Sequence, residues 1–188
     1  MGSPRVLPSM PISRTLTATG FLALAVLTID CRRPSADEAA APKGAACPAD
    51  AKKANLHFAL KDLEGKTVRL ADYAGKVLLL DFWATWCAPC KVEIPGFIDM
   101  YGKYKSRGFE VVGVVVLDRF ENAPSFAKQF KMNYTILDGV DREDIDQAFG
   151  PLFALPTTFI IGRDGRICDK HIGLTSKETF DTAIKSLL

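Results

Sequence analysis

The segment at residues 77–95, with the sequence VLLLDFWATWCAPCKVEIP, constrains the fold of this 188-residue chain more than any other. Residues 77–82 form an almost continuous apolar run that is interrupted only by Asp81. Such a run is typical of a strand that is buried on both faces, as in a parallel sheet. After a tight turn, the Cys-Ala-Pro-Cys sequence at residues 87–90 opens a segment with a helical pattern. The sequence therefore predicts a buried strand that turns into a helix at two cysteines.

The two cysteines have the spacing that thiol–disulfide exchange requires. Cys87 is expected at the helix start, where unpaired N–H groups and the helix dipole favour an anion. Its pKa should therefore be lowered and its thiolate nucleophilic near neutral pH. Cys90 lies one turn deeper and is expected to resolve the mixed disulfide that Cys87 forms. Pro89 suits this position because the N–H groups of a first helical turn have no helical partner.

Two acidic residues are candidates to accept the proton that Cys90 must lose. Asp81 lies in the apolar strand that leads into the motif, and Glu93 lies three residues after Cys90, on the same helix face. Burial should raise the pKa of both carboxyl groups, which suits proton transfer near neutral pH. Pro95 lies within the helical pattern and is expected to kink it.

Residues 81–91, DFWATWCAPCK, with Pro95 downstream, resemble the active site of thioredoxin. The Trp-Cys-x-Pro-Cys order followed by Glu93 and Pro95 is more similar to the TlpA/ResA branch, which comprises bacterial, extracytoplasmic, membrane-tethered thiol–disulfide oxidoreductases. The resemblance covers residues 56–188. It implies a thioredoxin fold of the α/β class, with a central mixed β-sheet flanked by helices, an N-terminal β-hairpin and a helix–strand insertion. The alternative, half of a zinc site, would need a second Cys-x-x-Cys or a His pair nearby, and the sequence has neither, so no metal is expected.

The rest of residues 56–188 fits this fold. The helix from Cys87 should end near Lys105, and a second buried strand at 109–117 would complete a right-handed crossover. His57 has no partner at ligand spacing and His171 is remote from the motif, so both are interpreted as surface or structural residues. The other expected elements are a hairpin over 56–70, a helix over 121–132 and a strand over 133–137 within an insertion at 118–140, a short helix over 144–149, a hairpin turn at 162–165, a last strand over 166–172 and a helix from Ser176 to Leu188.

A proline opens the strand pattern at residues 153–161, FALPTTFII. Pro156 at this place resembles the cis-proline loop of the thioredoxin family, and a cis bond before proline costs little. The resemblance implies that the loop faces the two cysteines and gives backbone hydrogen bonds to an extended substrate. It therefore implies a substrate-binding role for Leu155 and Pro156, together with Trp86 and Pro89. The alternative is an ordinary trans proline that begins an edge strand.

The first 31 residues have the order of an export signal or a membrane anchor. Arg5 and Arg14 precede an apolar run at residues 20–29, which is short for a membrane span. Cys31 follows this run, where a bacterial lipoprotein carries its lipidated cysteine, although the residues just before it are not small. Cleavage near residues 35–36 and an uncleaved anchor are alternative routes. All three predict an extracytoplasmic, periplasmic domain that is secreted or attached to the membrane.

Residues 32–55 are rich in Ala, Pro, Lys, Asp and Glu and are expected to form a flexible linker. The linker contains Cys47, and the last predicted hairpin contains Cys168. An oxidising compartment would permit a disulfide between these two cysteines. The alternative is two unpaired thiols, because the sequence does not give the distance between them.

The predicted function is thiol–disulfide exchange with protein substrates. The net charge of +2 gives no reason to expect a nucleic-acid partner. No nicotinamide or flavin fingerprint is present, so no cofactor is expected and the electrons should come from a protein. The resemblance implies a reductase of target proteins, for example in cytochrome c maturation or metal-centre assembly, that a membrane thiol-transfer protein supplies with electrons.

Three other activities remain as alternatives. The nearest is a disulfide-donating oxidase of the same fold, since the reduction potential of the cysteine pair decides between the two directions. A peroxiredoxin-like peroxidase ranks lower, because Thr85 stands two residues before Cys87 and no Pro-x-x-x-Thr-x-x-Cys motif is present. A copper carrier would need a further ligand such as Met100 or His171 beside the two thiolates.

Overall fold

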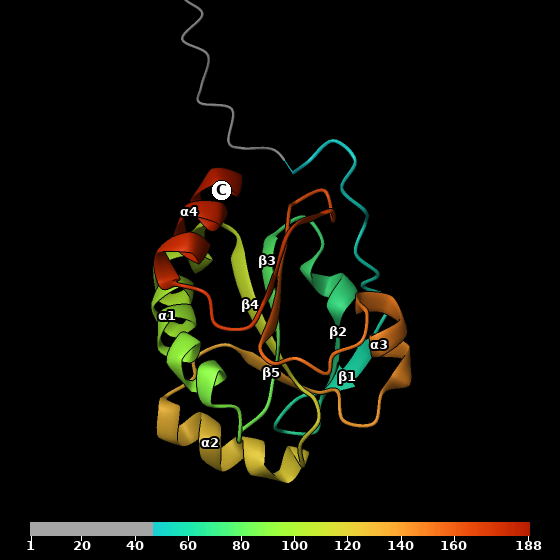
Figure 1. The fold of residues 1–188 in the computed structure, drawn as a ribbon, viewed down its shortest axis with the longest axis vertical. Coiled ribbons are helices and arrows are strands. Elements are labelled where there is room, and N and C mark those ends of the chain that lie inside the picture. Colours follow the sequence, from blue (N-terminus) through green and yellow to red (C-terminus); the bar gives the residue numbers. More distant parts are fainter. Residues whose placement is uncertain (1–46) are drawn as a thin grey trace, which may run out of the picture. The chain divides into compact units, whose positions relative to one another are not determined.

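The computed structural model describes residues 47–188 (Figure 1). The predicted export segment, Cys31 and the first part of the predicted linker lie outside the described residues. Among the helices of residues 47–188, none has the length and apolar character that crossing a membrane requires.

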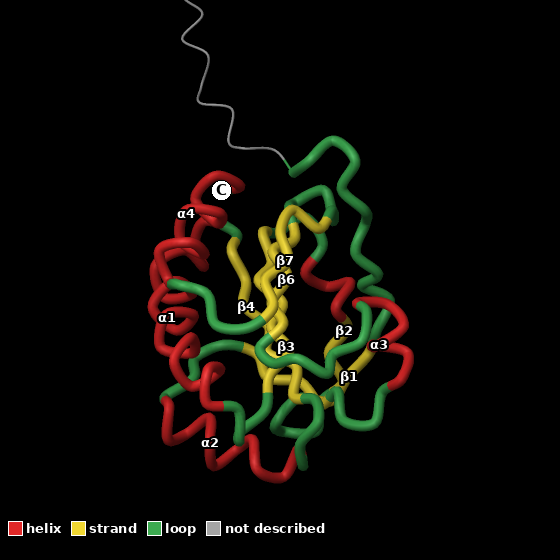
Figure 2. The backbone as a smooth tube through the Cα atoms, in the orientation of Figure 1, coloured by secondary structure: helices red, strands yellow, loops and turns green. Residues whose placement is uncertain are grey.

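A five-stranded mixed β-sheet forms the central layer (Figure 2). Its strand order is β5-β4-β3-β6-β7, and the predicted buried strand, β3, lies in the middle. β3 pairs in parallel with β4 and antiparallel with β6, which confirms the predicted mixed sheet. The strands are β3 (Val77–Trp83), β4 (Phe109–Val115), β5 (Thr135–Asp138), β6 (Thr157–Ile161) and β7 (Ile167–Ile172).

Side chains of β3 alternate between two apolar layers, and every residue of the strand is buried. Val77, Leu79 and Trp83 belong to the layer that also contains buried residues of helices α1 (Ala88–Tyr104), α2 (Ala123–Phe130) and α4 (Lys177–Leu187). The layer on the opposite face of the sheet contains Leu78, Leu80 and Phe82, with residues of α3 (Glu143–Phe149) and of the N-terminal hairpin. In Figure 1, α1 and α4 accordingly cover one face of the sheet, and α3 and the hairpin lie on the other. Asp81 shares the α1 face by this alternation.

The predicted hairpin and insertion are both present, with shorter elements. The hairpin pairs β1 (Ala59–Lys61) with β2 (Thr67–Arg69) in antiparallel register. In the insertion, α2 begins at Ala123 rather than at residue 121, because a 3₁₀ turn (Phe120–Asn122) precedes it and Pro124 stands in its first turn. It ends at Lys131, whose backbone is left-handed (φ 56°) and cannot continue the helix. Two further 3₁₀ turns span Leu70–Tyr73 and Lys105–Arg107.

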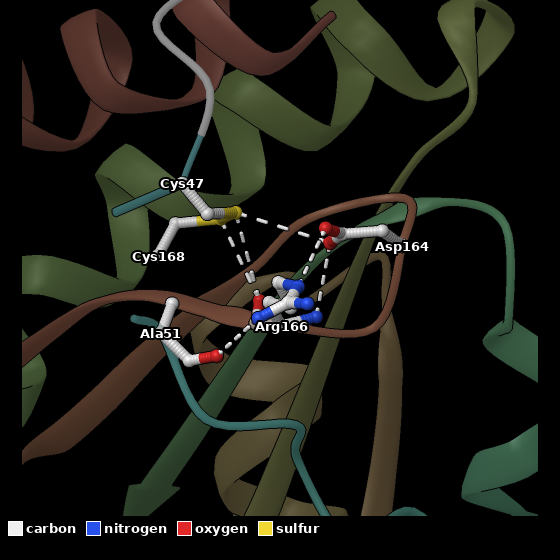
Figure 3. Close-up of polar contacts among 5 residues, drawn as sticks. All are labelled: Cys47, Ala51, Asp164, Arg166 and Cys168. Carbon is white, nitrogen blue, oxygen red and sulfur yellow. Dashed lines mark hydrogen bonds and ion pairs between the residues drawn. A yellow bond between two sulfur atoms is a disulfide. The ribbon is translucent and has the colours of Figure 1, made fainter. Parts of the chain in front are cut away.

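The segment that precedes the hairpin is joined to the β6–β7 hairpin by a disulfide between Cys47 and Cys168 (Figure 3). Beside it, the Arg166 guanidinium donates a hydrogen bond of 2.8 Å to the carbonyl oxygen of Ala51. Gly162 leaves room for the sulfurs, since a Cβ there would come within 2.8 Å of the Cys47 sulfur. Residues 47–55, assigned to the linker from the sequence, therefore contact the domain, while the domain boundaries themselves stay a prediction.

Removing this second disulfide is expected to destabilise the protein. The bond joins residues 121 positions apart, so it restricts the unfolded chain strongly. In oxidising buffer, Cys47→Ser/Cys168→Ser should lower the free energy of unfolding by about 2–4 kcal/mol relative to the parent. Urea titration measures the loss. In excess dithiothreitol the parent and the variant should unfold at nearly the same urea concentration, and equal midpoints in oxidising buffer would contradict the expectation.

Candidate active site

The Cys-Ala-Pro-Cys turn joins the end of β3 to the start of α1. Cys87 is the N-cap residue of α1, and its sulfur accepts a hydrogen bond of 3.2 Å from the backbone N–H of Cys90. The two cysteines form a disulfide with their Cα atoms 5.3 Å apart. Pro89 stands in the first helical turn, as predicted, and the helix continues past Pro95. The N–H groups of the first helical turn lack helical partners, and the one at Cys90 already points at the Cys87 sulfur, which favours negative charge at that atom after reduction.

Trp86 is held by the loop that follows β4. Its indole is 60% exposed, and the indole N–H donates a hydrogen bond of 2.8 Å to the carbonyl oxygen of Leu117. The backbone N–H of Thr85 donates a bond of 2.6 Å to the Asp118 carboxylate. These two contacts fix the turn before Cys87, while more than half of the Trp86 surface stays exposed to solvent.

The proline loop lies at the same edge of the sheet. The Leu155–Pro156 peptide bond is cis, as predicted. Because Phe82 pairs with Thr157 in the β3–β6 ladder, the residues before Thr157 lie beside the turn that follows β3. The backbone N–H of Gly173 donates a hydrogen bond of 2.8 Å to the carbonyl oxygen of Pro156. The substrate-binding roles of Leu155, Pro156, Trp86 and Pro89 stay a prediction.

The Asp81 carboxyl group is buried on the α1 face of the sheet, where Cys90 also packs. Only 1% of Asp81 is exposed, and its carboxyl accepts a hydrogen bond of 3.0 Å from the Thr158 hydroxyl. Burial raises the pKa of Asp81 to about 8, and the nearby charge of Glu93 contributes to the increase. The carboxyl group can therefore take up a proton near neutral pH.

Glu93 lies one turn after Cys90 and is 5% exposed. One carboxylate oxygen accepts a hydrogen bond of 2.5 Å from the backbone N–H of Thr175, and the other has no hydrogen-bond partner among residues 47–188. Burial raises the pKa of Glu93 to about 7, and the bond from Thr175 opposes the increase. The expected direction of the pKa shift is thus found for both acids, while their roles in proton transfer stay a prediction.

The residues considered as additional metal ligands do not join the two cysteines in a metal site within residues 47–188. His57 is exposed in the segment before β1, and the His171 ring packs 4.9 Å from the Phe180 ring, centroid to centroid. Met100 is fully buried in α1. Within the described part of the chain, no group of three or more His, Cys, Asp or Glu side chains is placed to hold a metal ion.

Four residues that hold the site were not found by sequence reasoning. Leu117 and Asp118 come from the loop after β4, Thr158 from β6 and Thr175 from the loop before α4. Thr158 is the direct cross-strand neighbour of Asp81, so the sheet register would have identified it. Leu117 and Thr175 contribute backbone groups, and the Asp118 carboxylate binds the backbone N–H of Thr85, so each contact depends on which distant segments meet and no local sequence pattern marks it.

The chain is similar to known proteins over most of the described region. Residues 51–170 match the model of the AhpC/TSA family. The thiol–disulfide oxidoreductase ResA of Geobacillus thermodenitrificans is 37% identical over 131 residues, which are 69% of this chain and 74% of that protein. The ResA of Bacillus subtilis is 37% identical over 111 residues, or 59% of this chain and 61% of that protein.

Solved structures agree with this relationship. A thiol:disulfide interchange protein of the thioredoxin family from Chlorobium tepidum superposes with a TM-score of 0.66 at 30% identity, over 74% of this chain and 99% of that chain. The StoA protein of Bacillus subtilis superposes with a TM-score of 0.55 at 25% identity, over 65% and 92% of the two chains.

Proposed function

The chain belongs to the AhpC/TSA family of the thioredoxin superfamily and is a thiol–disulfide oxidoreductase of the ResA type, and on this premise we propose that it reduces disulfide bonds of target proteins. The observation that carries the proposal is the Cys87–Cys90 disulfide at the N-terminus of α1, above two buried carboxyl groups with raised pKa values. The reduced pair would be the active form, and the disulfide in the structure would be the product of one turnover.

The proposed reaction consists of two exchange steps. The Cys87 thiolate attacks one sulfur of the target disulfide, so that a mixed disulfide forms and one target thiolate leaves. The Cys90 thiol loses its proton and its thiolate attacks the Cys87 sulfur, which releases the second target thiolate. The target disulfide gains two electrons and the enzyme dithiol loses two, so a thiol donor must reduce the enzyme again.

Asp81 and Glu93 would serve the second step. The Cys90 thiol is 1% exposed, so bulk water has little access to its proton. A carboxylate with a raised pKa is a stronger base than an ordinary one and can take that proton in a buried place. Asp81 is the first candidate, because it is the more deeply buried of the two and lies on the sheet face that α1 covers, and Glu93 is the second.

Leu155 and Pro156, with Trp86 and Pro89, would position the target. The β3–β6 register brings the residues before Thr157 beside the turn after β3, which carries Trp86, Cys87 and Pro89. An extended target segment could bind along this loop through backbone hydrogen bonds. Cys87 is 2% and Cys90 1% exposed, so a target bound close to this turn would be needed to bring its sulfur to Cys87.

We further propose that the protein works outside the cytoplasm, attached through its N-terminal segment, with a membrane thiol-transfer protein as its electron donor. The charge-then-apolar order of residues 1–31 supports export. The Cys47–Cys168 disulfide supports it as well, since structural disulfides persist in oxidising compartments. Cytochrome c maturation and metal-centre assembly are the candidate processes.

Stoichiometric exchange with a disulfide-containing peptide tests the proposal. The purified Cys47→Ser/Cys168→Ser protein, reduced and freed of reductant, should convert about one peptide disulfide per Cys87–Cys90 pair into the dithiol, because each cycle transfers two electrons and this pair is then the one dithiol that closes into a disulfide within residues 47–188. Alkylation and mass spectrometry would locate the newly formed protein disulfide. A reduced protein that leaves the peptide disulfide intact, while hydrogen peroxide oxidises Cys87 rapidly, would favour the peroxidase alternative. A fast reverse reaction, in which the oxidised protein converts the peptide dithiol completely, would favour the oxidase.

A further inference from the structure

A groove begins at Trp86, directly before the attacking cysteine. Its volume is about 620 Å³, and we call it the Trp86 groove. The loop after β4 forms one wall, and the segment between β5 and α3, with α3 itself, forms the other. The lining residues that matter below are Trp86, Leu117, Asp141, Glu143 and Asp146.

The end of the groove nearest Cys87 is apolar and fixed in place. Trp86 is 60% exposed and Leu117 is 55% exposed. The hydrogen bond from the indole N–H to the Leu117 carbonyl joins the two residues. Leu117 has a left-handed backbone (φ 54°), which a leucine rarely adopts, and this conformation leaves its side chain in solvent. Two large apolar side chains are thus exposed together, one of them directly before Cys87 in the chain, and they form a surface for part of a partner molecule.

The rest of the groove carries an excess of negative charge. Asp141, Glu143 and Asp146 are exposed, and none has an ion-pair partner within residues 47–188. Two arginines also line the groove, but each is close to an acid outside the lining. Arg142 makes two hydrogen bonds, of 2.8 and 2.7 Å, to Asp144, and Arg119 lies 3.9 Å from Glu121. The positive charges of the two arginines are thus compensated by neighbouring acids, whereas the negative charges of Asp141, Glu143 and Asp146 are not compensated.

We propose that the Trp86 groove binds a positively charged stretch of the target polypeptide next to its reacting cysteine. The inference rests on the proposed function and adds a preference to it: targets with lysine or arginine within a few residues of the disulfide react faster. The apolar end would contact the residues beside the cysteine, and the three acids would attract the basic side chains. An extended chain advances about 3.3 Å per residue, so a few residues lead from the Cys87 sulfur into the groove.

Two peptides that differ only in charge test this preference. Each contains one intramolecular disulfide, flanked by two lysines in one peptide and by two glutamates in the other. The rate of the reduced protein with each peptide is divided by the rate of dithiothreitol with the same peptide, which removes differences in intrinsic reactivity. At an ionic strength of about 0.01 M the parent should prefer the lysine peptide by about five- to tenfold, and the preference should nearly vanish at about 1 M, where the Debye length is only about 3 Å.

The variant Asp141→Asn/Asp146→Asn identifies the source of the preference. Asparagine keeps the shape of aspartate and tolerates the left-handed backbone of residue 141 (φ 56°). The variant should react more slowly with the lysine peptide and faster with the glutamate peptide. A folding defect would slow both reactions, so the opposite signs separate the two explanations. The matched control is Asp50→Asn/Glu178→Gln, which removes two exposed acids outside the groove and should keep the parent's preference.

The outcomes separate this inference from the proposed function. A parent that reduces neither peptide contradicts the proposed function and the inference with it. A parent that reduces both peptides at equal normalised rates at low ionic strength contradicts the inference alone. A preference that persists in the groove variant also contradicts it, because the attraction would then come from another part of the surface.

Discussion

Cys90→Ser is expected to trap the protein on its targets as a covalent mixed disulfide. The variant keeps Cys87 at the N-cap of α1, so the first exchange step should proceed. Serine cannot attack the Cys87 sulfur, and the second step should therefore stop. Catalytic turnover should be lost completely, while a complex with one equivalent of target accumulates. Non-reducing electrophoresis and mass spectrometry of the complex would measure this result.

The single variant Cys87→Ser is the matched control. It retains Cys90, which is buried one turn deeper, and should form no stable adduct. The two variants together assign the order of attack. A complex that forms through Cys90 in Cys87→Ser, and not through Cys87 in Cys90→Ser, would reverse the roles of the two cysteines.

Asp81→Asn is expected to slow the release of the target by about 100-fold above pH 8, where Asp81 is ionised, because a general base in a buried place contributes at least this much. The release step needs the ionised form of Asp81. Its pKa of about 8 means that the release rate of the parent should rise with pH and level off above pH 8. In the variant the titration near pH 8 should be absent, and the rate should rise only as the Cys90 thiol itself ionises. Stopped-flow measurement of release from a preformed mixed disulfide, between pH 5 and pH 10, would show both effects.

The raised pKa of Asp81 also makes the folding stability of the protein depend on pH. The folded-state pKa of Asp81, about 8, lies above its ordinary value of 3.8, so the folded protein holds the proton more tightly than the unfolded chain. The resulting stabilisation is fully present below pH 3.8 and is lost as the pH rises to about 8. Asp81→Asn removes this pH-dependent contribution to stability. Its stability relative to the parent should therefore increase between these two pH values, as denaturant titrations at several pH values would show.

Glu93→Gln is the control that separates the two acids. It removes the other buried carboxylate, whose pKa is about 7, and keeps Asp81. If Asp81 is the base, the release rate in this variant should still titrate near the pKa of Asp81, at a slightly lower pH because the neighbouring negative charge is gone. A parent-like release rate in Asp81→Asn, together with a large loss in Glu93→Gln, would assign the proton transfer to Glu93 instead.

Local patterns in the sequence predicted the sheet and most of its flanking elements. The apolar run of β3 is a strong signal, because a strand that is buried on both faces must be apolar almost throughout. The pattern after Cys87 is a strong signal as well, because few residue types are favoured at a helix start. The ends of α2 were less predictable. Pro124 and the left-handed backbone at Lys131 shorten this helix at both ends, and a hydrophobic pattern does not report backbone angles.

The site was predictable where its residues are adjacent in sequence. Cys87, Cys90 and the two acids follow from one segment, since helix and strand periodicity place them. The contacts of Trp86 with Leu117 and of Asp81 with Thr158 depend on which distant segments meet, and this requires the strand register. The Cys47–Cys168 pair was left open for the same reason, since the two cysteines are 121 residues apart and only the fold brings them together.

The central claim is that the Cys87–Cys90 pair donates electrons to target disulfides. Its reduction potential tests the claim most directly. Equilibration of the purified protein with defined ratios of reduced and oxidised dithiothreitol, followed by alkylation and mass spectrometry, would follow this pair separately from Cys47–Cys168. We predict a value near that of thioredoxin, about −270 mV or lower. A value near that of the strong oxidant DsbA, about −120 mV, would contradict the claim and make the protein a disulfide donor.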